Sequence, residues 1–281
     1  MLEGNYAGFR LEIKQPYIAL ITFDQPGRLN GMTAAMKRDL SEAMLQLQYD
    51  ESARVVVITG EGRAFCAGDD VGGGYMKDEE WQRARSSKVS RSRTDGLGSY
   101  GSLRTISQAL NRAIRDLDKI TIAAINGIAI QSGFSLALAC DFRIAARTAR
   151  LGSATLRFGY LPDEGGHHLL VRHIGVARTL DFLMRKRIVD APQALELGLV
   201  HEVVEPENLM TSAMLLAEEF AYGPQVAMRL LKRAIYAAAD LTFDQAGDDI
   251  ATKTGISDHH PDTKEGLRAW REKRPPRFNG D

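Results

Sequence analysis

Hydrophobic positions in the first part of the chain form short runs that are typical of strands. Residues 9–13 alternate between apolar and polar side chains, residues 17–23 are mostly apolar, and residues 55–59 are apolar up to a closing threonine. Between the second and third runs, Thr33 precedes apolar residues at helical spacing, namely Met36, Leu40, Met44 and Leu47. Thr33 is therefore expected to cap a helix that ends near Gln48.

Strand and helix patterns alternate through the middle of the chain and give way to helices alone. A helix is expected over residues 102–117, a strand over 121–125, a short helix over 133–139 and a strand over 141–145. From Glu207 onward the pattern is helical, with stops at Gly223–Pro224 and Pro261. This order predicts an α/β core over residues 1–205 and a C-terminal helical region over residues 206–281.

A polar, glycine-rich stretch from Val71 to Thr105 interrupts this pattern. It contains three consecutive glycines, then many Arg, Lys and Ser residues, then further glycines. Two interpretations stay open: a mobile loop or lid over a site, or a solvated loop with a short helix near residues 79–85.

Composition narrows the classes of partner. The 36 basic and 36 acidic residues cancel, which gives no electrostatic argument for nucleic acid. The longest apolar stretch, over residues 120–139, is interrupted by polar residues and glycine, so no membrane span is expected, and no signal peptide precedes the first strand. The cysteines, Cys66 and Cys140, form no metal-binding or paired motif, so we expect no metal site and a reduced, cytoplasmic setting.

Two segments share a buried strand, a turn of small residues and a following helix. They are residues 63–70 and residues 125–135. Small residues let a ligand approach the backbone, and a turn that enters a helix directs free N–H groups outward, where negative charge is favoured. Two such amides aimed at one point would form an oxyanion hole. Either segment alone is also consistent with an ordinary tight strand–helix connection.

Taken together and in this order, these segments resemble the signatures of the crotonase superfamily, the enoyl-CoA hydratase/isomerase family. The first signature is Ala64-Phe65-Cys66-Ala67-Gly68-Asp69-Asp70, and the second is Asn126-Gly127-Ile128-Ala129-Ile130-Gln131-Ser132-Gly133. A strand of the CDxRIA type at residues 140–145, a P-x-x-G-G turn at residues 162–166 and a closing segment at residues 265–278 complete the resemblance.

The resemblance implies a spiral of β-β-α turns and C-terminal helices that pack into a homotrimer or homohexamer. It implies that the main-chain amides of Asp69 and Ser132 are the oxyanion donors, although Gln131 and Ser132 replace two glycines of the usual triplet. It places coenzyme A along the first loop and the first signature, at Pro26, Arg28, Leu29, Ala64, Cys66 and Ala67. The coenzyme A would be carried by the substrate, so no separate cofactor is expected. Arg28 could pair with phosphate oxygens or be a solvated surface residue.

The expected acid or base departs from the hydratase pattern. The two positions that carry glutamates in hydratases are Ser135 and Thr155 here. A carboxyl does occur at Glu164, in the P-x-x-G-G turn where related isomerases often carry a single base, with Asp163 beside it. Both could instead be ordinary turn or helix-capping residues. His167 and His168 follow directly and are weaker candidates.

The sequence therefore favours an acyl-CoA enzyme that stabilises a thioester enolate, with an enoyl-CoA isomerase as the leading interpretation. A hydratase, lyase or C–C hydrolase that uses Glu164 with a water is the alternative within the family. A catalytically silent acyl-CoA-binding subunit is the alternative of another class. A dinucleotide-binding dehydrogenase is disfavoured, because no G-x-G-x-x-G follows a first strand.

Overall fold

The computed structural model describes residues 2–70 and 96–279, and it contains two sheets. The larger sheet has the strand order β1-β2-β3-β4-β6-β8-β11. It consists of β1 (Gly4–Tyr6), β2 (Phe9–Lys14), β3 (Ile18–Phe23), β4 (Val55–Gly60), β6 (Ile120–Ile125), β8 (Phe142–Ala146) and β11 (Glu202–Val204). The first three strands pair antiparallel, and the pairings from β3 to β11 are parallel.

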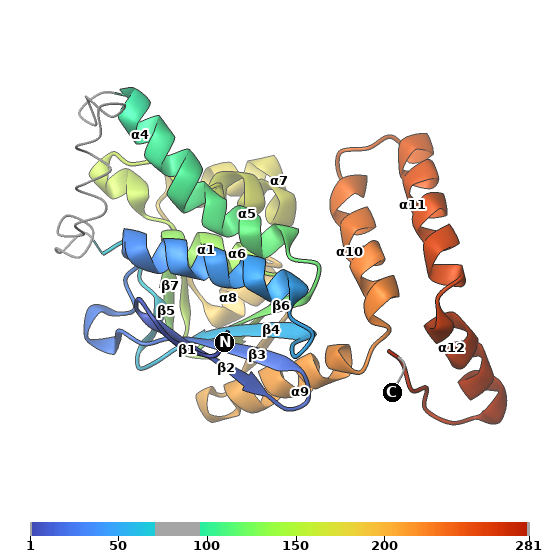
Figure 1. Cartoon of the computed structure of the whole chain (residues 1–281). Coiled ribbons are helices and arrows are strands. Elements are labelled where there is room, and N and C mark those ends of the chain that lie inside the picture. Colours follow the sequence, from blue (N-terminus) through green and yellow to red (C-terminus); the bar gives the residue numbers. More distant parts are fainter. Residues whose placement is uncertain (1, 71–95, 280–281) are drawn as a thin grey trace.

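The smaller sheet has the order β10-β9-β7-β5 and supplies the second strand of each spiral turn. Its strands are β5 (Ala64–Cys66), β7 (Ile128–Ile130), β9 (Arg150–Gly152) and β10 (Ile188–Asp190). The chain passes from β4 to β5, from β6 to β7 and from β8 to β9, and helices follow the second strand of the later pairs (Figure 1). This repeated passage is the predicted β-β-α spiral. β5, β7 and β10 are too short for their periodicity to identify them as strands.

Helices cover both faces of the larger sheet. The main core lies between that sheet and the helices α1 (Ala34–Tyr49), α5 (Gln108–Asp116), α6 (Ser132–Ala139) and α7 (Gly166–Met184), with α8 (Ala191–Glu196) at its edge. Thr33 caps α1 by accepting from the Met36 amide, as predicted. The opposite face is covered by α9 (Leu209–Ala221), whose alanines pack on Ile18, Val55 and Ile122.

The helix predicted over residues 102–117 begins earlier than expected. α4 (Gly96–Ser102) continues through a π-helical turn at Leu103–Ser107 into α5. Residues 96–105 are therefore helical and not part of a polar loop, although glycine has a low helix propensity. The rest of the Val71–Thr105 stretch, including the short helix expected near residues 79–85, lies outside the described residues.

The last three helices stand beside the core, and the chain reaches them through α9 (Figure 1). They are α10 (Gln225–Ala238), α11 (Phe243–Asp258) and α12 (Pro261–Glu272), and the predicted stops at Gly223–Pro224 and Pro261 separate helices as expected. Because α9 packs on the sheet, the helices that leave the core begin at α10. No helix within residues 2–70 and 96–279 is long and apolar enough to cross a membrane.

Candidate active site

The two signature segments lie next to each other because β5 and β7 are neighbouring parallel strands. Ala64 pairs with Ile128, and Cys66 pairs with Ala129. Their close approach requires glycine: a Cβ at Gly127 would lie 2.1 Å from the Arg63 carbonyl oxygen, and one at Gly133 would lie 2.2 Å from the Cys66 carbonyl oxygen. The residues that follow both strands, including Asp69 and Ser132, therefore emerge at the same edge of the smaller sheet.

The amide of Asp69 is directed away from its neighbouring chain segment. In the parallel bridge between Met32 and Asp69, the Met32 amide donates to the Gly68 carbonyl at 2.8 Å, and the Asp70 amide donates to the Met32 carbonyl at 3.0 Å. These two bonds are made by the residues on either side of Asp69. The N–H of Asp69 itself therefore points away from Met32. Within the described chain, that N–H donates to no protein acceptor.

The amide of Ser132 is the first of helix α6. It belongs to the helix N-terminal N–H groups that have no intrahelical acceptor, and no side chain caps it. The residue before it, Gln131, has φ 54° and ψ −123°, a conformation that favours glycine. The strain of replacing the glycine triplet therefore falls on Gln131, while Ser132 keeps an ordinary helical start.

Glu164 is buried just before α7, and hydrogen bonds to the main-chain carbonyls of its turn hold it in place. Its side chain and main chain together are 7% exposed. The Asn111 amide donates to the Glu164 carbonyl at 2.9 Å, and Gln108 donates to the Asp163 carbonyl at 3.0 Å, so α5 fixes the turn. The neighbouring Asp163 is only partly buried.

A continuous series of polar contacts links Glu164 to α1. Glu164 Oε1 lies 2.6 Å from Ser132 Oγ, and Ser132 Oγ lies 2.5 Å from Asp69 Oδ1. Asp69 Oδ1 lies 2.7 Å from Lys37 Nζ, which also donates to Ser107 Oγ at 2.9 Å. The Lys37 side chain is 1% exposed. Glu164 Oε2 is buried without a hydrogen-bond partner in the described chain.

Burial is the first cause of the shifted proton affinities here. Burial raises the pKa of Glu164, and the negative charges of Asp69 and Asp163 raise it further. The positive charge of Lys37 acts in the opposite direction and lowers it. Burial also raises the pKa of Asp163. Burial raises the pKa of the Cys66 thiol to about 12, so that cysteine is a packing residue rather than a nucleophile.

Sequence reasoning did not identify the side chains of Lys37, Asp69 and Ser132 as members of the site. Only the amides of Asp69 and Ser132 were expected to contribute. A signal for Lys37 was present, because it falls beside Met36 and Leu40 on the apolar stripe of α1, where a lysine is seldom buried without a partner.

The residues expected near coenzyme A lie on the first loop and on β5. Pro26 and Arg28 belong to a short 3-10 helix, and the Ala67 amide donates to the Leu29 carbonyl at 3.0 Å. Arg28 is an exposed side chain that pairs with Asp70 at 2.7 Å. The side chains of Ala64 and Cys66 are fully buried. These two residues could therefore offer a ligand only their main chain.

The remaining candidates lie at the margin of the site. The Ser135 hydroxyl packs closely against Gly166, where a Cβ would lie 2.2 Å away. Thr155 lies in a 3-10 helix with its hydroxyl 3.4 Å from that of Ser153. His167 and His168 are exposed, and His167 Nδ1 lies 3.3 Å from the Pro162 carbonyl. The structure does not bring either histidine to Glu164 by any contact among the described residues.

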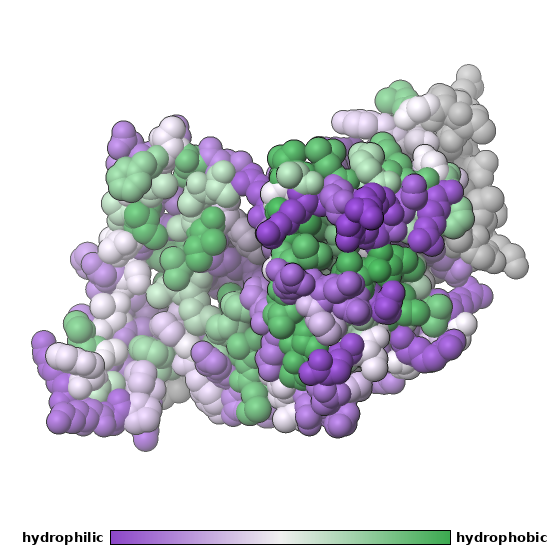
Figure 2. Space-filling model, turned by 180° about the vertical axis from the view of Figure 1, so that it is seen from behind, coloured by the Kyte–Doolittle hydropathy of each residue, from purple (hydrophilic) through white to green (hydrophobic). Residues whose placement is uncertain are grey.

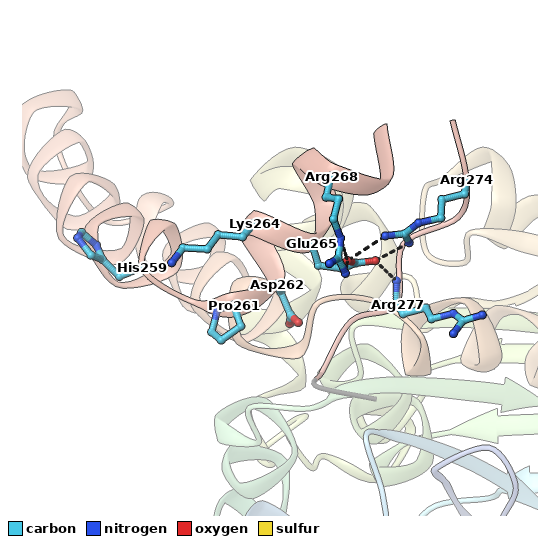
Figure 3. A pocket seen from close by; sticks show the side chains of 8 residues that line it. All are labelled: His259, Pro261, Asp262, Lys264, Glu265, Arg268, Arg274 and Arg277. Carbon is cyan, nitrogen blue, oxygen red and sulfur yellow. Dashed lines mark hydrogen bonds and ion pairs between the residues drawn. The ribbon is translucent and has the colours of Figure 1, made fainter. Parts of the chain in front are cut away.

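A separate hollow of about 790 Å³ lies on the C-terminal helices, away from Glu164. Figure 3 shows Glu265 at its centre, with Arg268, Arg274 and the main chain of Arg277 directed at the carboxylate. These contacts lower the pKa of Glu265 and fasten the C-terminal tail to α12. Among residues 2–70 and 96–279, no cluster of His, Cys, Asp or Glu is suited to a metal ion.

Known proteins share this arrangement over almost the whole chain. Residues 14–281 match the family model described as enoyl-CoA hydratase/isomerase. A probable enoyl-CoA hydratase of Rhodobacter capsulatus is 33% identical over 98% of this chain and 99% of its own length. A 1,2-epoxyphenylacetyl-CoA isomerase of Escherichia coli is also 33% identical, over 94% of this chain and 95% of its own length.

Solved structures agree with the sequence relatives. The crystal structure of an enoyl-CoA hydratase from Bacillus anthracis superposes with a TM-score of 0.86 at 30% identity and covers 98% of this chain and 100% of that protein. The spiral, the paired signature segments and the extent of these matches lead to one conclusion: the chain belongs to the enoyl-CoA hydratase/isomerase family of the crotonase superfamily.

Proposed function

We propose that this enzyme is an enoyl-CoA isomerase, which moves a double bond in an acyl-CoA through an enolate. The amides of Asp69 and Ser132 would bind the thioester oxygen, and Glu164 would take a proton from one carbon and return it to another. The observation that carries the proposal is the burial of an unpaired carboxyl oxygen, Glu164 Oε2, beside the helix start that supplies the Ser132 amide.

A proton shuttle needs a group that is both a base and an acid near neutral pH. Burial raises the pKa of Glu164 toward that range. The two positions that carry glutamates in hydratases hold Ser135 and Thr155, neither of which can act as a carboxylate. One carboxyl with a raised pKa is sufficient for the isomerase reaction, since the same group serves both proton transfers.

The test compares wild type and Glu164→Gln on 3-enoyl-CoA and 2-enoyl-CoA thioesters. We expect wild type to isomerise the 3-enoyl substrate and Glu164→Gln to lose about 10²–10⁴-fold in kcat, the usual contribution of a positioned acid or base. Glu196→Gln on α8 is the matched control, because Glu196 is exposed and remote from the site. Full activity of Glu164→Gln on every substrate turned over would refute the assignment of the base.

A hydratase is the second candidate, and the side chain of Asp69 favours it. Asp69 and Glu164 both contact Ser132 Oγ, so two carboxyls do lie close together although neither is at a hydratase glutamate position. Hydration of 2-enoyl-CoA without isomerisation of 3-enoyl-CoA would select this candidate. Binding of acyl-CoA without any α-proton exchange in deuterated water would instead select a catalytically silent subunit.

The proposal also covers where coenzyme A binds and how copies of the chain assemble. The first loop, with Pro26, Arg28 and Leu29, and the main chain of Ala64, Cys66 and Ala67 would carry the coenzyme A part of the substrate. The C-terminal helices would join copies of the chain into a homotrimer or homohexamer. Both described cysteines are free and buried, which is consistent with a cytoplasmic enzyme.

A further inference from the structure

Four side chains from four separate segments form one series of contacts, which is buried except at Asp69, whose side chain is 31% exposed. Lys37 comes from α1, Asp69 follows β5, Ser132 begins α6, and Glu164 precedes α7. The contacts run from Lys37 Nζ to Asp69 Oδ1 at 2.7 Å, to Ser132 Oγ at 2.5 Å and to Glu164 Oε1 at 2.6 Å. Lys37, Ser132 and Glu164 are all buried.

The hydrogens available to these contacts fix their direction. Oxygen–oxygen distances of 2.5 and 2.6 Å are hydrogen-bond distances, so each needs one hydrogen. The Ser132 hydroxyl supplies one hydrogen, and an ionised carboxylate supplies none. The second hydrogen must therefore sit on a carboxyl, and Asp69 is the carboxyl that already pairs with the Lys37 ammonium at 2.7 Å. The hydrogen falls to Glu164, which donates to Ser132, while Ser132 donates to Asp69.

We propose that Lys37 and the side chain of Asp69 are positioning residues that set the charge state and orientation of Glu164 through the Ser132 hydroxyl. This inference rests on the proposed role of Glu164 as the base. Oε1 is occupied by the Ser132 contact, and Oε2 is the oxygen left for the substrate. Glu164 is in its acid form at low pH, and it becomes the base when that proton is lost to bulk water as the pH rises.

The charged groups around Glu164 make opposite contributions, and this gives the proposal a distinctive signature. Lys37 from α1 favours the ionised form of Glu164, whereas Asp69 after β5 and the adjacent Asp163 oppose it. The Cys66 thiol, with its raised pKa, is neutral near pH 7. Asp69→Asn removes a negative charge and leaves Lys37, so Glu164 ionises more readily. Lys37→Met does the reverse.

The experiment measures kcat/KM for 3-enoyl-CoA against pH with the full chain, since that profile reports the groups of the free enzyme. We expect the rise in rate with pH to move about one pH unit lower in Asp69→Asn and about one unit higher in Lys37→Met. The Asp69→Asn substitution keeps the main-chain amide, so the oxyanion donor is retained. Lys14→Met, which removes a half-exposed lysine at the end of β2, is the control and should not move the profile.

Ser132→Ala provides a second measurement if Lys37→Met fails to fold. It retains the amide but removes the hydroxyl that links Glu164 to Asp69, so we expect the midpoint of the profile to differ from that of wild type and kcat to fall while KM stays within about twofold. Midpoints of Asp69→Asn and Ser132→Ala that match wild type, or shifts of Asp69→Asn and Lys37→Met in the same direction, would overturn the proposal. If Glu164→Gln is inactive while these midpoints stay fixed, the base assignment stands and only the positioning role fails.

Discussion

A carboxyl that takes and returns a proton should be buried and should keep one oxygen free of hydrogen bonds within the protein. Glu164 meets both conditions, because one oxygen is bonded to Ser132 and the other is buried without a partner in the described chain. A fully hydrogen-bonded carboxylate would have a lowered pKa and be a poor base. The site thus leaves one polar atom unpaired where a substrate could pair it.

Single glycines also determine whether the two signature segments can meet. A Cβ at Gly133 would lie 2.2 Å from the Cys66 carbonyl oxygen, which is backbone and cannot move independently. We expect Gly133→Ala to lower the free energy of unfolding by about 1–3 kcal/mol and to reduce kcat, because β5 must shift away from α6. Denaturant unfolding and steady-state kinetics measure the two effects.

The control for this substitution is Gly255→Ala on α11. A Cβ there meets nothing within 4 Å, and alanine is favoured over glycine in a helix by about 1 kcal/mol. We expect this variant to be slightly more stable than wild type, with unchanged activity. If Gly133→Ala behaved like Gly255→Ala, the close approach of the segments would not be needed for the site.

Residues that act through their side chains were harder to predict than those that act through their backbone. The resemblance to the crotonase superfamily implied the roles of the Asp69 and Ser132 amides, and the pairing of β5 with β7 places both residues at one edge of the smaller sheet. The contact of Lys37 with Asp69 joins residues far apart in sequence, and no local pattern encodes that distance. The backbone conformation of Gln131 was likewise not predicted, because the sequence shows that Gln131 and Ser132 replace two glycines but not which of them has the positive φ.

At the scale of helices and strands, the hydrophobic periodicity predicted the long elements well. Thr33 and the apolar stripe of α1 located that helix nearly to the residue. The short strands β5, β7 and β10 were not recognisable by periodicity, because three residues contain barely one alternation. Their pairing depends on tertiary context.

One element, α10, is fastened to the core by a buried ion pair. Lys232 Nζ lies 2.8 Å from Asp141 Oδ2, which also accepts from the Thr121 amide, and the Tyr236 hydroxyl donates to Asp141 Oδ1. We expect Lys232→Met to lower the free energy of unfolding by about 3–5 kcal/mol, because it leaves a buried carboxylate without its cation. Denaturant titration followed by circular dichroism measures this loss.

Lys253→Met is the matched control for that variant. Lys253 pairs with Asp249 one turn earlier on α11, and helix-surface pairs of this kind contribute only about 0.3–0.5 kcal/mol. A loss for Lys232→Met no larger than for Lys253→Met would mean that α10 is held by apolar packing alone.

For the whole molecule, the C-terminal helices expose more apolar surface than a single chain can cover. Figure 2 shows this surface on the face opposite to that of Figure 1. α11 has sixteen residues, none of them buried, and Phe243 and Trp270 are 92% and 77% exposed. A helix of that length gains most of its stability from burying an apolar face. The homotrimer or homohexamer proposed above would cover this exposed surface with other copies of the chain.

We therefore expect the protein in solution to have about three or six times the mass of one chain by light scattering. Phe243→Lys and Trp270→Lys should each reduce that mass, because a buried lysine in an apolar contact is costly. Glu196→Lys on α8 introduces the same charge on the core and should leave the assembly intact. A monodisperse single chain for wild type would show that these helices are stable without a partner, and the assembly proposal would then fail independently of the chemistry at Glu164.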